Sequence, residues 1–152
     1  MLRWPIVSAA CLLLATPAVT GPPKPVESEW LATASGGITV DGDPKGHDGA
    51  LHYEMEFKLR KTVTKPLFVT VDFENPVDRG APLFAEIELA PGATSFGVKS
   101  VPIHAIRNRE KYLVKVWIFA DQKRRQLLGT HEQLVLFKMP SELLEQLGVT
   151  LL

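Results

Sequence analysis

Cysteine is nearly absent from this chain, since only Cys11 occurs among its 152 residues. A framework of disulfide bonds and a cysteine-based metal site are therefore both excluded. Neither charge is in excess, because 17 Lys and Arg balance 17 Asp and Glu. That balance argues against a nucleic-acid binder with a dominant basic face, and against an acidic disordered tail.

Long hydrophobic runs are also missing, apart from one short segment near the start. Residues 1–18 place Arg3 ahead of about a dozen apolar residues and then small residues, which is the layout of a secretory signal peptide. The apolar stretch is too short to span a bilayer. We prefer cleavage after Ala18, with cleavage after Thr20 as the alternative. A lipoprotein signal would use Cys11, but the apolar run continues beyond that residue, which disfavours lipidation.

Removal of this leader leaves a chain without cysteine. Secreted eukaryotic domains of this size often carry disulfides, whereas many bacterial envelope proteins carry none. We therefore expect an exported bacterial protein, periplasmic or secreted, with no transmembrane segment. Residues 19–26 include the sequence GPPKP, which predicts an extended Pro-rich linker ahead of one domain over 27–140.

Helical periodicity is weak in this domain, whereas alternation of apolar and polar residues with a period of two is strong. It runs from Leu51 to Arg60, and it recurs over 67–74 and 83–90, as is typical of strands with one buried face. Longer apolar strands are expected over 111–120 and 126–138, and weaker ones near 29–34, 38–40 and 95–101. Seven to eight short strands separated by turn residues predict an all-β antiparallel sandwich.

One helical pattern occurs, in the C-terminal residues 141–152. Ser141 follows Pro140 as an N-cap, and Gly148 ends the pattern. The leucines that share one side of this predicted short C-terminal helix are Leu143, Leu144 and Leu147. Such a short helix is not stable alone in water, so we expect it to pack on the domain.

Residues 103–116 resemble the corner before the penultimate strand of immunoglobulin-like and fibronectin type III domains. The apolar Ile106 precedes a polar turn, after which Tyr112 opens an alternating strand. The resemblance implies an immunoglobulin-like β-sandwich with a tyrosine corner, in which the Tyr112 hydroxyl bonds backbone between Ile106 and Asn108. Val114 occupies the place of the second cysteine of antibody domains, which leaves a generic sandwich. A fold of this kind implies no activity.

The segment Asp41–Asp48 has carboxylates at its first and third positions and a glycine at its sixth, as in a calcium loop. Lys45 in a ligand position, and His52 where a bidentate carboxylate is needed, favour an ordinary turn. Copper or zinc would need several of the histidines, with Met55 as a soft extra ligand, but these residues show no compact spacing: His47, His52, His104 and His131. A small envelope metal-binding protein, using this loop with His47 and His52, is the alternative function.

No hydrolytic site can be assembled from the remaining residues. The domain has no nucleophile motif and no pair of carboxylates that can be placed across a cleft. We therefore expect a non-enzymatic protein without a cofactor, which works as a binding or accessory module.

Charge is distributed unevenly between the two ends of the expected sandwich. The connection after residue 59 and the hairpin between the last two strands lie at one end, and their basic residues are Arg60, Lys61, Lys65, Lys123, Arg124 and Arg125. The acidic residues of the other end are Asp41, Asp43, Asp48, Glu74 and Asp78. A solvated loop end is the ordinary interpretation. The functional interpretation is contact with an acidic protein patch, or with an anionic envelope component such as lipid headgroups or polysaccharide.

The strand over 111–120 is apolar on both faces. Leu113, Trp117 and Phe119 share the face that Lys115 interrupts, and Phe68, Val135 and Phe137 could extend this surface on neighbouring strands. Something must cover such a face. We expect the C-terminal helix to do so; the alternative is a partner or a second copy, for which Trp117 and Phe119 would be contacts.

Overall fold

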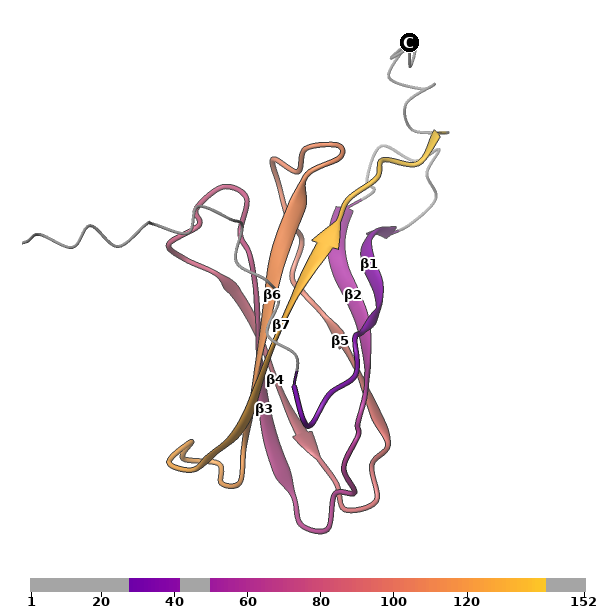
Figure 1. Ribbon diagram of the computed structural model, residues 1–152. Coiled ribbons are helices and arrows are strands. Elements are labelled where there is room, and N and C mark those ends of the chain that lie inside the picture. The colour runs from indigo at the N-terminus through magenta and orange to yellow at the C-terminus, as the bar shows by residue number, and fades with distance from the viewer. Residues whose placement is uncertain (1–27, 42–49, 142–152) are drawn as a thin grey trace, which may run out of the picture.

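The computed structural model describes residues 28–41 and 50–141 (Figure 1). They form seven strands: β1 (Ser35–Asp41), β2 (Ala50–Lys58), β3 (Leu67–Phe73), β4 (Leu83–Leu89), β5 (Ser95–Lys99), β6 (Lys111–Phe119) and β7 (Leu127–Leu136). A three-stranded sheet has the order β1-β2-β5, and a four-stranded sheet has the order β4-β3-β6-β7, with all pairs antiparallel. The expected all-β class is confirmed, and two such sheets are consistent with a β-sandwich. The expected leader, the linker and residues 42–49 lie outside the described residues, as does the C-terminal helix except for Ser141.

Alternation places the core residues of the central strands as expected. On β2, Tyr53, Met55 and Phe57 are buried while Glu54 and Glu56 are exposed. On β3 every second residue from Leu67 to Phe73 is buried. The inner faces meet through aromatic stacking, since the rings of Tyr53 and Phe73 lie 4.9 Å apart. Burying each such side chain contributes roughly 1.5–3 kcal/mol to the stability of the domain.

The N-terminal segment differs from the expected strand over 29–34. Only Leu31 forms a β-bridge there, with Leu59, and β1 begins at Ser35. Gly36 permits this late start, because its φ is +96° and a Cβ there would collide with the carbonyl oxygen of Glu54. Trp30 packs directly over Gly129 of β7, where a Cβ would also collide. The segment therefore crosses between the two sheets before it joins β1.

The expectation that Val135 and Phe137 point outward is wrong. Val135 is paired with the inward Tyr112, and both Val135 and Phe137 are buried in the core. The register with β6 decides which residues of β7 face the core, because β7 carries apolar residues on both of its faces. Leu134 and Leu136, which alternate with these two residues, are exposed instead.

The interpretation of all four histidines as solvated is also wrong, because His52 and His131 are buried. His52 points away from the sandwich core, but Nε2 lies 3.0 Å from the Thr39 hydroxyl and 3.4 Å from a Glu54 carboxylate oxygen. His131 points inward, where its ring meets Phe57 edge to face. Hydrogen bonding and packing therefore hold both rings out of water.

The tyrosine corner is confirmed. The backbone N–H of Arg107 donates a 2.8 Å hydrogen bond to the Tyr112 hydroxyl, between the two residues expected to bracket the contact. That hydroxyl in turn donates to the Glu110 carboxylate at 3.1 Å. Tyr112 itself is buried, so the corner fixes the β5–β6 connection to the start of β6.

Candidate functional site

The strand register brings the two basic connections to one end of the molecule. Phe68, at the start of β3, pairs with Phe119, at the end of β6. The β2–β3 connection and the β6–β7 hairpin therefore lie at the same end, as Figure 1 shows. We term this the basic end, and all of its predicted residues are exposed: Arg60, Lys61, Lys65, Lys123, Arg124 and Arg125.

The β6–β7 hairpin is braced by Asp121. A carboxylate oxygen of Asp121 accepts hydrogen bonds from the backbone N–H groups of Gln126 at 2.9 Å and Arg125 at 3.1 Å. The hydrogen bond from the N–H of Gln126 is the main cause that lowers the pKa of Asp121; desolvation acts in the opposite direction, and the N–H groups of Arg125 and Lys123 lower this pKa further. This carboxylate is the only one between residues 120 and 126, and it is engaged with backbone rather than with the adjacent basic side chains.

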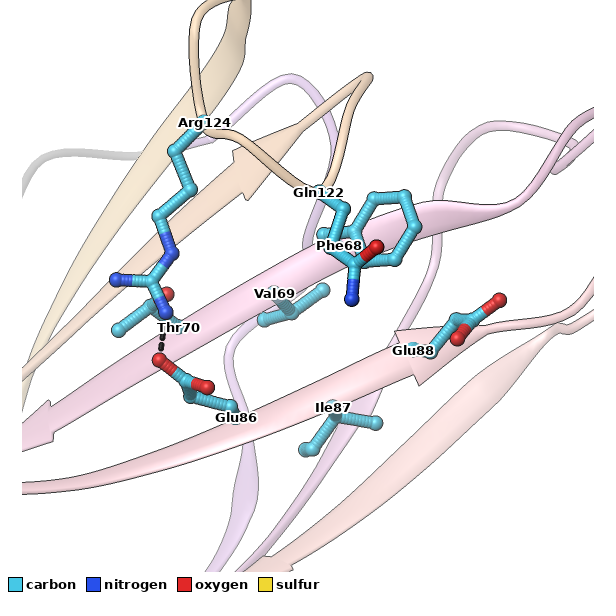
Figure 2. A pocket seen from close by; sticks show the side chains of 8 residues that line it. All are labelled: Phe68, Val69, Thr70, Glu86, Ile87, Glu88, Gln122 and Arg124. Carbon is cyan, nitrogen blue, oxygen red and sulfur yellow. Dashed lines mark ion pairs between the residues drawn. The ribbon is translucent and has the colours of Figure 1, made fainter.

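Arg124 has a backbone conformation that residues other than glycine seldom adopt. Its φ is +55°, a conformation that costs about 1–2 kcal/mol for such a residue. Its guanidinium lies over the outer face of the sheet and pairs with Glu86 of β4, as Figure 2 shows. Thr70 and Phe68 of β3 line the same small pocket. Arg124 therefore joins the basic end to the outer sheet face.

The other basic side chains at this end are less engaged. Lys61 pairs with Glu29 at 3.1 Å, and its ammonium lies 5.0 Å from the centre of the Trp30 ring. Both partners of that ion pair are exposed, so it contributes little. Within the described residues the remaining four form no ion pair: Arg60, Lys65, Lys123 and Arg125.

The opposite end carries cationic residues as well as the expected acidic residues Glu74 and Asp78. Its exposed cationic residues include Arg79, Arg107, Arg109, Lys111 and Lys138. Arg79 pairs there with Glu74 at 2.9 Å and with Glu110 at 3.6 Å. Most of the cationic residues of this end lie in the connections between β3 and β4 and between β5 and β6. What distinguishes the basic end is three consecutive cationic residues on one braced hairpin.

The outer face of the four-stranded sheet carries Trp117 and Phe119, both partly buried. Their neighbours across the sheet are Thr70 and Phe68, so this aromatic surface exists as expected. Charged side chains lie beside it, because Lys115 forms a 3.3 Å ion pair with Glu132. Asp72 and Glu86 lie on the same face. The sequence pattern did not single them out as site residues, because they look like ordinary outward residues of amphipathic strands.

The residues of the metal alternative are not gathered within the described part of the chain. No group of three or more His, Cys, Asp and Glu that could hold a metal ion occurs in residues 28–41 and 50–141. His104 is exposed and His131 faces the core, so these two do not converge. His47 and most of the Asp41–Asp48 loop lie outside the described residues.

No protein family model matches the chain, and no curated protein matches it. Among solved structures, the crystal structure of Bacteroides uniformis β-glucuronidase matches with a TM-score of 0.39 and 17% identity. The match covers 65% of this chain and 13% of that one. Within the described ranges, no helix has the length and apolarity needed to cross a membrane.

Proposed function

We propose that this chain is an exported, non-enzymatic binding module of the bacterial envelope that contacts an anionic partner through its basic end. The observation that carries the proposal is the β6–β7 hairpin, in which the Asp121 carboxylate fixes the backbone beneath Lys123, Arg124 and Arg125. A loop that is already ordered loses less conformational entropy when it binds, so its charges act at lower cost.

We propose further that the sandwich is of the immunoglobulin-like or fibronectin type III-like kind. The hydrogen bond between Tyr112 and Arg107 supports this, because a tyrosine corner is a feature of such domains. The pairing of β4 with β3 argues against the constant-type arrangement, in which the fourth strand joins the sheet of the first two. A fold at this level leaves function to the surface.

Export rests on the composition of residues 1–18 and on the lack of cysteine beyond them. An envelope protein meets phosphate and carboxylate groups on lipids, polysaccharides and other proteins. The exposed cations of the basic end would attract any of these groups, at about 1 kcal/mol per basic residue near an anionic surface. Because the contacts are exposed, added salt would weaken them.

Charge reversal on the hairpin tests the proposal. One variant combines Lys123→Glu, Arg124→Glu and Arg125→Glu. The matched control combines Arg107→Glu, Lys111→Glu and Lys138→Glu, which changes the net charge equally at the opposite end. Binding is measured by co-sedimentation with phosphatidylglycerol vesicles, with phosphatidylcholine vesicles as the neutral reference, and by pull-down on polygalacturonate.

We expect the native chain to bind at least one of the anionic probes, and the hairpin variant to bind it about tenfold or more weakly. The control should retain most of the binding. Equal losses in the two variants would mean that net charge alone matters, and would contradict a specific basic end. Absence of binding to both anionic probes would also contradict the proposal.

A further inference from the structure

The outer face of the four-stranded sheet is hollowed beside Trp117. A shallow cavity of about 600 Å³ lies over β3 and β6. Its lining residues are Asp72, Glu74, Arg79, Pro82, Leu113, Lys115 and Trp117. Its volume lies within the range of sites that bind small molecules.

Asp72 is the acceptor in this cavity that the protein leaves unused. It is partly buried, yet its carboxylate accepts no hydrogen bond and forms no ion pair within the residues that the structure describes. Burial raises the pKa of Asp72, although the charges of Lys115 and Arg124 act in the opposite direction. Glu74 differs, because its two carboxylate oxygens accept from Arg79 and from the backbone N–H of Leu113.

The charges around the cavity balance. Asp72 and Glu74 oppose Arg79 and Lys115, so an anionic ligand and a cationic ligand would each meet a like charge. The same four side chains supply both acceptors and donors of hydrogen bonds. The cavity also lies on the face of the sheet, away from the free backbone groups of an edge strand, which argues against an added peptide strand.

We propose that this cavity is a binding site for a neutral saccharide. A sugar ring has an apolar C–H face that packs on an indole, and hydroxyl groups at its rim that both donate and accept. Trp117 supplies the aromatic surface, Asp72 accepts from a hydroxyl, and Lys115 or Arg79 donates to another. The residues that line the cavity include none of those of the basic end, so either proposal can fail without the other.

Titration with neutral trisaccharides tests the site. The probes are maltotriose, cellotriose and N,N′,N″-triacetylchitotriose, added to the full chain at millimolar concentrations. Tetramethylammonium and polygalacturonate serve as the cationic and anionic comparison ligands. The readout is the NMR signal of the Trp117 indole N–H, identified by its loss in Trp117→Phe. Trp117→Ala and Asp72→Ala remove the two central groups. Phe84→Ala is the control, because Phe84 is an aromatic residue on the same face, 67% exposed, that does not line the cavity.

We expect at least one trisaccharide to shift the Trp117 signal. Trp117→Ala and Asp72→Ala should weaken that binding about tenfold or more, as measured calorimetrically, whereas Phe84→Ala leaves it unchanged. Asp72→Asn keeps an acceptor oxygen and should retain most of the affinity for a neutral sugar. The proposal is overturned if no trisaccharide shifts the signal. It is also overturned if only tetramethylammonium or polygalacturonate does so, or if binding survives in Trp117→Ala.

Discussion

The side-chain amide of Gln133 hydrogen-bonds both backbone polar groups of Ala34. The Ala34 N–H donates to Oε1 of Gln133 at 2.8 Å, and Nε2 of Gln133 donates to the Ala34 carbonyl at 3.1 Å. This amide takes the place of a neighbouring strand, and it joins the segment before β1 to β7. The same Oε1 lies 3.3 Å from Nε2 of His131 on β7, so the amide also contacts a buried ring of its own strand.

Gln133→Leu should therefore destabilise the protein by about 1–3 kcal/mol, because it leaves the N–H and carbonyl of Ala34 without partners in a buried setting. Urea denaturation measures the loss. Glu132→Gln is the control: it removes only the half-exposed ion pair with Lys115 and should cost less than about 1 kcal/mol. Equal losses in the two variants would show that the amide does not hold the segment.

Tyr112→Phe removes the hydroxyl that accepts from the Arg107 N–H and donates to Glu110. We expect a loss of about 1–2 kcal/mol in the free energy of unfolding, since the ring still fills its place in the core. Glu110→Gln leaves the bond to Arg107 in place and should have a smaller effect. A wild-type stability for Tyr112→Phe would contradict a structural role for the corner.

His131 should make the stability depend on pH. Burial lowers its pKa in the folded protein, with Arg60 acting in the same direction and Gln133 opposing. As pH falls below about 6.5, the unfolded chain binds a proton at this residue before the folded protein does, so folding is disfavoured. We expect the free energy of unfolding to fall between pH 7.5 and 5.5, and His131→Leu to reduce that slope. An unchanged slope would exclude His131 as the cause.

Arg124→Gly should leave the protein as stable as the native chain, or make it slightly more stable. Glycine adopts a φ of +55° freely, which relieves about 1–2 kcal/mol of backbone strain. The exposed ion pair with Glu86 that it removes is worth less than that. Arg125→Gly, where the conformation is ordinary, should instead lower the melting temperature. The two thermal unfolding curves, compared directly, check this difference.

Period-two alternation was sufficient to predict β2, β3 and β4 together with their buried faces. It failed on β7, because Leu134 and Leu136 oppose Val135 and Phe137, and only the register with Tyr112 sets which pair is buried. Tertiary contacts that no local pattern encodes account for the other omissions. The hydrogen bonds of Gln133 join residues far apart in sequence, and the cavity beside Trp117 needs Arg79 from another connection.

The sequence interpretation placed the basic residues at one end, in agreement with the strand register. It did not indicate the backbone conformation or the contacts of each residue. Lys123, Arg124 and Arg125 are all basic residues, yet only Arg124 of the three has a positive φ and pairs with Glu86. That difference arises from the hairpin geometry set by Asp121, and from the distance to β4 across the sheet.

NMR mapping of the anionic contact tests whether the chain binds through its basic end. The backbone amide signals of the full chain are followed while polygalacturonate or phosphatidylglycerol vesicles are added at low and then high salt. We expect the largest changes to fall in residues 60–65 and 121–126, and to be lost at high salt. Changes confined to the opposite end, around residues 107–111, would contradict binding through the basic end.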